Sequence, residues 1–588
     1  MEPLKEFSLS YLDIGIMVGY AVLIIAYGLY HAKRNSSEEY FLAGRDMLWP
    51  IVGISLFAAN ISSSTLVGLA SDAFNTDTHV FNYEWMAAVI LIFFSIFFLP
   101  FYLQSKVYTM PEFLERRYDS RSRYYFSFIT IVGNVIIDTA AGLYVGNIVL
   151  KLIFPDLPSY VIILVLATAA AAYTIPGGLN SVIQTEVVQA ILLVLGSVIL
   201  TYFAYEKVGG WDALLAGLDA KHAAGEIKTN AADTLSLIRP ADDEYMPWTA
   251  LLLGAPILGF YFWANNQFMV QRVLGAKDIN HGRWGALFAG LLKLPVIFFM
   301  VLPGTFAIIL YSNMDLSNLN YTLNDGSICR VLKDCPNMTY PVLLFDLLPA
   351  GMLGLVLAGL LAAMMSSVSA TFNSASTLIT MDFVRKARPN LTSDQLVRIG
   401  QIATLVLVVL ASLWAPQIER FGSLFRYLQL VLAFICPPVV AVFILGLFWR
   451  RANSEGSFYS LLVGFFIALG ILFNEAYGWS PAVTEIHFLH KAFYLFVICA
   501  LVHIFISIAT PEPEATFQRA ATTDDVIDLE DVTREGQLIE DRLDRYIWTS
   551  DIFTRETEEL KSVVWYKNYR ILAIGLLILT ALLVGSFW

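Results

Sequence analysis

Charged residues are scarce in this chain. Only 15% of its 588 residues are Asp, Glu, Lys or Arg, whereas a soluble globular protein carries about 25%. The chain is 57% hydrophobic, with a mean hydropathy of +0.64. So apolar a chain would aggregate in water, which excludes an ordinary soluble protein. The composition instead indicates a protein whose solvent is the lipid bilayer.

Histidine, cysteine and basic residues are also few, and these shortages exclude further classes of function. The seven His and four Cys show no metal-ligand pattern, and no nucleophile–base pair supports an enzyme. The formal net charge of −12 argues against a nucleic-acid partner. Much of that charge lies in residues 510–566, with fifteen acidic and six basic residues, so the acidity says little about any ligand.

The four cysteines fall into two pairs. Cys436 and Cys499 lie in apolar runs and are interpreted as small buried hydrophobes. Cys329 and Cys335 flank a short polar stretch, and on an oxidising face of a membrane they could either form a disulfide or stay reduced. The N-terminus has no basic n-region and no small-residue cleavage site, so we expect its first apolar run to be a membrane span and not a signal peptide.

Apolar runs long enough to cross a bilayer recur along the whole chain. A spanning helix needs about 20 mostly apolar residues. Fourteen runs meet this requirement, near residues 10–31, 47–72, 80–105, 123–153, 159–175, 183–206, 247–272, 284–311, 343–383, 398–415, 422–449, 456–475, 488–509 and 569–588. The sequence therefore predicts an all-α membrane protein with about 14 transmembrane helices.

Lys and Arg alternate between the connecting segments. Basic segments include HAKRNSSEEYFLAGR, SKVYTMPEFLERRYDSRSR, RVLGAKDINHGR, VRKARPNLTSDQLVR and WRRANSEG, whereas DAFNTDTH, APQIERFG and NEAYGWSPAVTEIH are poor in basic residues. Because basic loops favour the cytoplasmic side, we expect both termini, and the loop with Cys329 and Cys335, to lie outside. The acidic segment 510–566 is then cytoplasmic, either as a solvated linker with a surface helix or as a regulatory or partner-binding segment.

Polar residues interrupt two of the runs at membrane depth. The run 47–72 contains Asn60-Ile-Ser-Ser-Ser-Thr65, and the run 247–272 contains GAPILG followed by Asn265-Asn-Gln267. Unpaired backbone groups in hydrocarbon are costly, so a broken helix persists only beside a cavity, an ion or other protein. Each interrupted run opens a block of five spans, and this recurrence is typical of an inverted-repeat transporter with its site at the midplane.

The run 343–383 carries a row of small polar residues. Ser366, Ser369, Asn373 and Ser376 share one helical face, and Ser367 is adjacent. Such a face can serve helix packing in a membrane. It can equally supply hydroxyl and carbonyl oxygens to sodium, a hard cation, and the pattern leaves both interpretations open.

Ionisable residues within the runs are candidate functional residues. We expect Glu84, Asp138 and Lys293 to face a shared polar cavity, or else Asp138 and Lys293 to pair as a structural bridge. A lysine beside carboxylates and amides suits hydroxyl-rich ligands. Glu186 lies near the cytoplasmic end of its run, where it could be solvated or buried, and Gln429 could bind solute or hold helices together.

Several segments resemble the sodium/solute symporter family, and within it the sodium–glucose cotransporter branch. The resemblance covers roughly residues 10–510 and implies a LeuT-like five-plus-five inverted repeat with extra helices at both ends. It is carried, in family order and spacing, by AANISSSTLVGLA, YEWMAA, YTMPEFLERRY, YTIPGGLNSVIQTE (Tyr173 to Glu186), NQFMVQRVLGAK and MSSVSATFNSASTLITMD.

The resemblance implies a principal sodium site between two of these segments. Its ligands would be the carbonyls of Ala58, Ile61 and Ala363 and the hydroxyls of Ser366 and Ser367.

A second sodium site is implied where Ser369 stands. Relatives that use it also carry an acidic residue, usually Asp, at the position of Glu186, and the longer side chain here leaves this second site open.

The implied sugar pocket contains Glu84, Trp263, Lys293 and Gln429, with Phe262 where the family usually has a gating Tyr. We also expect Asn60, Thr65 and Asp138 to face the solute.

Three positions near the pocket differ from the family pattern. Thr65 stands where His or Gln is usual, Asp138 where Asn or Lys is usual, and Gly259 where a bacterial relative has Asn.

The sequence thus predicts a sodium-coupled symporter that imports a hexose by alternating access across a plasma (inner) membrane. Inositol or another polyol, or an organic acid such as sialic acid, is the alternative solute, and a membrane-embedded sensor is a remote alternative. The expected divisions are an N-terminal helix (1–45), two repeats (46–206 and 247–450), an extracellular loop (207–246), two extra helices (451–509), the acidic segment (510–566) and a last helix (567–588). The oligomeric state is left open.

Overall fold

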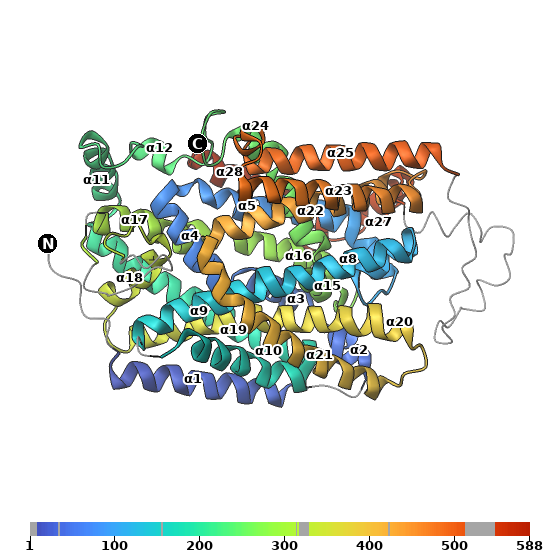
Figure 1. Ribbon diagram of the computed structural model, residues 1–588, viewed down its shortest axis with the longest axis horizontal. Coiled ribbons are helices and arrows are strands. Elements are labelled where there is room, and N and C mark those ends of the chain that lie inside the picture. Colours follow the sequence, from blue (N-terminus) through green and yellow to red (C-terminus); the bar gives the residue numbers. More distant parts are fainter. Residues whose placement is uncertain are drawn as a thin grey trace.

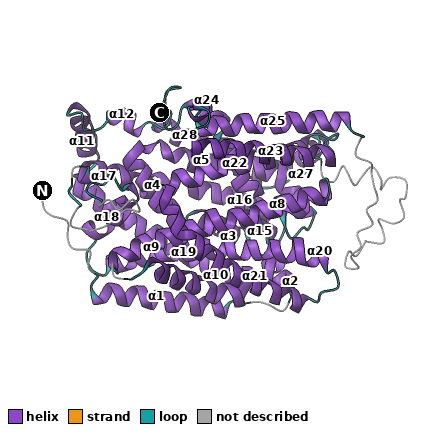
Figure 2. Cartoon of the chain, viewed as in Figure 1, coloured by secondary structure: helices purple, strands orange, loops and turns teal. Residues whose placement is uncertain are grey.

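The computed structural model describes residues 9–32, 36–154, 157–312, 314–316, 329–421, 424–511 and 547–588. Within these ranges the regular structure is helical, apart from two isolated β-bridges (Figures 1 and 2). The α-helices are α1 (Tyr11–Tyr30), α2 (Ser37–Leu42), α3 (Trp49–Asn60), α4 (Ser63–Thr76), α5 (Asn82–Phe93), α6 (Leu99–Gln104), α7 (Met110–Arg117), α8 (Ser120–Gly133), α9 (Ala140–Ile153), α10 (Ser159–Val208), α11 (Trp211–Ala223), α12 (Ala231–Leu235), α13 (Trp248–Leu253), α14 (Ala255–Phe260), α15 (Gln267–Leu274), α16 (Ile279–Lys293), α17 (Leu302–Tyr311), α18 (Thr339–Leu347), α19 (Met352–Leu378), α20 (Arg385–Ala387), α21 (Ser393–Trp414), α22 (Leu424–Phe448), α23 (Ser454–Tyr477), α24 (Pro481–Thr484), α25 (Phe488–Ala509), α27 (Ser550–Lys561) and α28 (Tyr569–Ser586).

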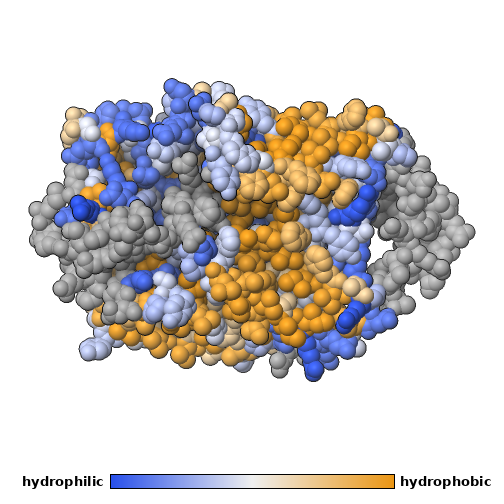
Figure 3. Space-filling view, in the orientation of Figure 1, coloured by the Kyte–Doolittle hydropathy of each residue, from blue (hydrophilic) through white to orange (hydrophobic). Residues whose placement is uncertain are grey.

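Most of the long helices run along the long axis of the molecule (Figure 1). Apolar residues cover much of the middle of the face seen in Figure 3, and polar residues gather toward its two ends. An apolar girdle between two polar caps is what a bilayer imposes on a protein that spans it. The long axis therefore lies across the membrane.

Ten helices among the described residues are long and apolar enough to cross a membrane, or up to twelve if each bent helix pair is one span. The expected number of fourteen is not reproduced. Part of the difference lies in α10, which covers two of the expected spans in 50 residues. A straight helix of that length would measure about 75 Å, more than twice the hydrocarbon thickness. Its halves meet at Gly178, where the backbone is not helical (φ 59°, ψ −158°) and the carbonyl of Tyr40 approaches closely.

Both expected helix breaks are present. The expected span 47–72 bends by 57° between α3 and α4. The other break lies at Asn266, whose extended backbone separates a π-helical turn, η5 (Tyr261–Asn265), from α15. A third bend, of 43°, was not expected and separates α16 from the helix beginning at Ile297. Pro295 lies in this bend and has no N–H to continue the helical ladder.

The expected span 343–383 is wrong at its start. Residues Thr339–Leu347 form a separate helix, α18, and α19 begins only at Met352. The intervening turn contains Gly351, whose φ of 87° suits a residue without a Cβ. The long helix then continues to Ala387 through a π-helical turn, η9 (Ile379–Val384), and α20.

One end of the molecule gathers the start of α1, the loop 207–246 and the end of α28. Asp13 in the first turn of α1 accepts hydrogen bonds from the backbone of Gly351 and Gly354, each at 2.7 Å. The N–H of Leu237 in the loop donates to the carbonyl of Phe587 at 2.8 Å. The described starts and ends of the chain thus lie on the same side.

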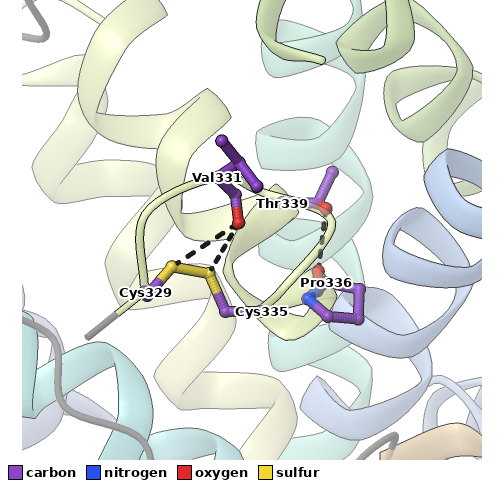
Figure 4. The surroundings of a disulfide bond; sticks show 5 residues. All are labelled: Cys329, Val331, Cys335, Pro336 and Thr339. Carbon is purple, nitrogen blue, oxygen red and sulfur yellow. Dashed lines mark hydrogen bonds between the residues drawn. A yellow bond between two sulfur atoms is a disulfide. The ribbon is translucent and has the colours of Figure 1, made fainter. Parts of the chain in front are cut away.

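Cys329 and Cys335 form a disulfide at this same end (Figure 4). Lys333, between the two cysteines, donates to the carbonyl of Glu226 in the loop 207–246 at 2.9 Å. The disulfide excludes the alternative of two free thiols at these positions. Cys436 and Cys499 are buried free cysteines, as expected.

The basic segments meet at the opposite end. Arg45 donates to the carbonyls of Lys106 and Val107 at 2.9 and 3.1 Å, and Arg121 pairs with Glu455 at 2.7 Å. Of the acidic segment 510–566, residues 512–546 lie outside the described ranges, and the described remainder contains the helix α27.

The buried apolar side chains form two large clusters that meet at the break between α3 and α4. The first cluster contains Phe57 and Ile61 from the first break, together with much of α9, α10 and α19. The second contains the intervening Ala59 and most of α5, α14, α15 and α22. The broken helix of α3 and α4 thus lies on the seam between the two clusters, where the candidate site is found.

Candidate functional site

The break between α3 and α4 releases two backbone carbonyls. In a continuous helix the N–H of Ser62 would bond the carbonyl of Ala58, but here it donates to the carbonyl of Asn60 at 3.0 Å. The N–H of Thr65 would likewise bond Ile61, but it donates to Oγ of Ser62 at 3.0 Å. The carbonyls of Ala58 and Ile61, which the sequence predicts as sodium ligands, have therefore lost these helical donors.

The serines of α19 face the same region, because α19 packs against both α3 and α4. Ser367 donates to the carbonyl of Ala363 at 3.1 Å. The hydroxyl of Ser366 is buried, and no described residue is within hydrogen-bonding reach of it. A buried hydroxyl without a partner is costly, so its oxygen is available to a ligand. The freed carbonyls and these hydroxyls are uncharged oxygen atoms, the kind of ligand that a hard cation such as sodium prefers.

The two residues of the expected second sodium site, Ser369 and Glu186, both lie near Tyr173, and each is bonded to other residues. Ser369 donates to the hydroxyl of Tyr173 at 2.7 Å. Glu186 is fully buried, which excludes the solvated alternative, and it accepts a hydrogen bond from Ser55 at 2.6 Å. Its carboxylate also forms an ion pair with Arg272. Both oxygens of Glu186 are thus engaged by protein donors.

Arg272 is a residue that the sequence interpretation missed. We assigned it to a basic loop at the membrane surface, but it lies in α15 and is 1% exposed. Its Nε donates to Glu186 at 3.2 Å, and its Nη1 donates to the carbonyl of Phe268. One signal in the sequence could have identified Arg272. A carboxylate buried in a membrane protein needs a cationic partner, so burial of Glu186 would require a nearby Lys or Arg.

A buried ion pair lies at the centre of the expected solute pocket. Lys293 of α16 and Glu84 of α5 form this pair. The Lys293 ammonium also lies 5.7 Å from the ring centre of Trp263 and 5.9 Å from that of Phe57, which is within the range of cation–π attraction. The structure therefore brings together three predicted pocket residues, and Phe57 is an addition to them.

Phe262, the expected gating aromatic, lies on η5 beside Trp263. The two rings meet edge to face, with centroids 5.4 Å apart, and Phe262 packs similarly against Phe268 at 5.6 Å. Phe262 is half-buried whereas Trp263 is buried.

Asp138 does not pair with Lys293, so the alternative of a structural bridge between them is wrong. Asp138 lies on the π-helical turn η4 (Asn134–Thr139), half-buried, close enough to Tyr261 and Cys436 to interact with them electrostatically. No cation pairs with it among the described residues. Gln429 lies two helical turns before Cys436, on the same face of α22, and no hydrogen bond among the described residues joins it to Glu84 or Lys293.

Asn60 and Thr65, which are expected to face the solute, are both half-buried at the break. Oγ1 of Thr65 donates to the carbonyl of Asn60 at 3.0 Å, whereas the side-chain oxygen of Asn60 is buried without a partner among the described residues. Asn265, at the second break, has both side-chain amide atoms in the same condition. Asn265 was recognised only as part of a polar run, and its unpaired amide adds it to the candidates.

Comparison with known proteins agrees with this geometry. The family model described as the sodium:solute symporter family matches residues 40–464. Sodium/glucose cotransporter 1 of Mus musculus is 34% identical over 534 residues, covering 86% of this chain and 80% of that protein. The sodium/mannose cotransporter of Bos taurus is 34% identical over 527 residues, covering 86% and 88%.

Solved structures share the fold. A sodium-coupled sialic acid symporter in a substrate-bound, outward-open state aligns with a TM-score of 0.71 at 21% identity, covering 86% of this chain and 99% of the other. This likeness confirms the expected LeuT-like architecture. The chain belongs to the sodium:solute symporter family and is a multi-pass membrane transporter that couples solute movement to sodium, not an enzyme.

Proposed function

We propose that this transporter imports a hexose sugar together with sodium, and that its solute site surrounds the Glu84–Lys293 pair. The observation that carries the proposal is this buried pair beside the indole of Trp263. A sugar hydroxyl both donates and accepts hydrogen bonds, so a carboxylate and an ammonium held together match it. The aromatic face of Trp263 or Phe262 suits the apolar face of a sugar ring.

The named relatives support a sugar, since two of them are sodium cotransporters of glucose and of mannose. The main rival is an organic acid, because the structural neighbour is a sialic acid symporter. The Glu84–Lys293 pair argues against this rival, because Glu84 already neutralises Lys293 and leaves no free positive charge for an anion at this pair. A polyol such as inositol has the same hydroxyl chemistry as a hexose and is the second candidate.

The proposed sodium site is the set of oxygens at the break, from Ala58, Ile61, Ala363, Ser366 and Ser367. Sodium there would join the α3–α4 break to α19 and stabilise the shape of the neighbouring solute site. Each sodium that moves down 100 mV supplies about 2.3 kcal/mol, enough for a roughly fiftyfold solute gradient. Alternating access would follow from movement of the broken helices against the rest of the bundle.

We place the basic segments in the cytoplasm of a plasma (inner) membrane, and both termini outside. The oxidised Cys329–Cys335 pair at the opposite end supports this orientation. The two repeats are assigned to residues 46–206 and 247–450, because each starts with a broken helix.

Uptake of radiolabelled solutes into proteoliposomes tests the proposal. We expect glucose or mannose to accumulate only with an inward sodium gradient, and faster with an interior-negative potential. The same assay with inositol and sialic acid identifies the solute class. Uptake without sodium would overturn the coupling, and sodium-driven uptake of sialic acid alone would overturn the sugar assignment.

A further inference from the structure

The C-terminal part of the chain crosses the basic end of the molecule before its last helix. Residues 547–570, here called the strap, contain Trp548, the exposed helix α27 and the first turn of α28. The strap contacts two groups of helices. One group contains α16, which packs against the broken helix α3, and α5, which packs against α16. The other contains α22, which packs with α23 and α25.

Trp548 anchors the strap to both groups. Its backbone N–H donates to the carbonyl of Leu447 in α22 at 2.9 Å. Its ring packs edge to face on Phe448 of α22, at 5.9 Å between centroids, and on Phe97 at 5.2 Å. Phe97 lies in the π-helical turn η3 (Phe94–Phe98) that continues α5, and it also contacts Phe448 at 5.5 Å. Trp548 thus covers the point where the two groups touch.

Glu556 forms a second attachment. Its carboxylate pairs with Arg283 of α16 at 2.5 Å, accepts a hydrogen bond from the hydroxyl of Tyr569 at 2.6 Å, and pairs with Arg570 at 3.0 Å. Arg283 is buried, donates to the carbonyl of Ser95 at 3.0 Å and lies 4.0 Å from the ring centre of Tyr569. Glu556 therefore has three partners, from α16 and α28, although α27 itself has no buried residue.

In a transporter of this architecture, opening one end requires the broken-helix group to move against the rest. A segment fixed to α16 through Glu556 and to α22 through Trp548 resists that movement. We propose that the strap is a latch that holds the basic end closed, and that its release accompanies opening at that end. The inference rests on the proposed transport cycle, but its main test does not require transport.

Hydrogen–deuterium exchange of the full chain in nanodiscs tests the latch. Glu556→Gln and Trp548→Ala should speed exchange about fivefold in residues 94–104 and 441–448, because these segments separate when the basic end opens. Glu558→Gln and Trp565→Ala are matched controls, since Glu558 pairs only with Lys561 on the surface and Trp565 is 68% exposed. A strap that merely rests on the surface would change exchange in 549–561 alone, and that result would overturn the latch.

The same four variants in proteoliposomes separate this inference from the proposed function. We expect sodium-driven uptake by the wild type and both controls at equal rates, and a changed maximal rate in the two latch variants. Absence of sodium-driven uptake in the wild type would refute the transport proposal while the exchange result still decides the latch. Equal exchange and equal uptake in all variants would refute the latch alone.

Discussion

The ammonium of Lys293 and the carboxylate of Glu84 form an ion pair that is shielded from solvent between α16 and α5. Two charges removed from water stabilise a protein little as a pair, but removing one partner leaves the other uncompensated at a cost of about 3–5 kcal/mol. A pair that costs so much to break is retained for specificity or function. Here the pair also lies beside Trp263, at the break in the second repeat.

We therefore expect Glu84→Gln to lower the melting temperature and abolish uptake, because Lys293 becomes a lone buried charge. The double variant Glu84→Gln/Lys293→Met should recover the melting temperature but not uptake. Glu558→Gln, which breaks an exposed pair, should change neither. Normal sugar uptake by the double variant would contradict the assignment of this pair to the solute site.

The unpartnered hydroxyl of Ser366 gives a different expectation. Because no described residue bonds it, Ser366→Ala should leave stability without sodium unchanged. Loss of one oxygen ligand should raise the sodium concentration for half-maximal uptake about tenfold, or about 1.4 kcal/mol. Ser376→Ala is the control, since that hydroxyl donates to the carbonyl of Asn373 at 3.0 Å. Equal sodium dependence in both variants would contradict the site.

Much of this arrangement was predictable from sequence, because polar residues inside an apolar run have few explanations in a membrane. Asn60–Thr65 marked the first break and Asn265–Gln267 the second, and both are present. The bend before Ile297 was missed, although Pro295 was available as a signal. The number of fourteen spans is not confirmed by the ten to twelve apolar helices among the described residues, in part because two of the expected spans join at Gly178 within α10.

Pairing of the buried charges was not predictable in the same way. Glu84, Asp138 and Lys293 were each identified as intramembrane charges, but only the fold decides which carboxylate Lys293 meets. Arg272 was misplaced because a basic residue at the end of an apolar run is usually interfacial. Its burial depends on α15 packing against α3, a contact between segments more than 200 residues apart.

The Glu186–Arg272 pair leads to an expectation about coupling. A second sodium near Ser369 would need the carboxylate of Glu186, but that carboxylate is already bonded by Arg272 and Ser55. We therefore expect one sodium per solute, with a Hill coefficient near one in sodium-dependent uptake. Simultaneous measurement of charge and solute flux checks this. Two charges per neutral solute would show that Arg272 releases Glu186 during the cycle.

The charge of Glu115, at the basic end of the molecule, should make the stability of the fold depend on pH. Glu115 pairs with Arg123 at 2.5 Å and with Lys386. Burial alone would raise the pKa of the Glu115 carboxyl, but hydrogen bonds from Lys386 and Arg123 outweigh it and hold the pKa below its ordinary value of 4.5. A carboxyl whose pKa is lower in the folded state stabilises the fold above its unfolded pKa, and this contribution is lost as pH falls through the folded pKa.

The melting temperature of the wild type should therefore exceed that of Glu115→Gln at pH 7, and the difference should shrink as pH falls below 4.5. Thermal unfolding in detergent at pH 7, 5 and 4 measures it. Glu559→Gln, on the exposed face of α27, should show no difference from the wild type at any of these pH values. A difference that stays constant down to pH 4 would mean that Glu115 stabilises the fold by packing and not by its charge.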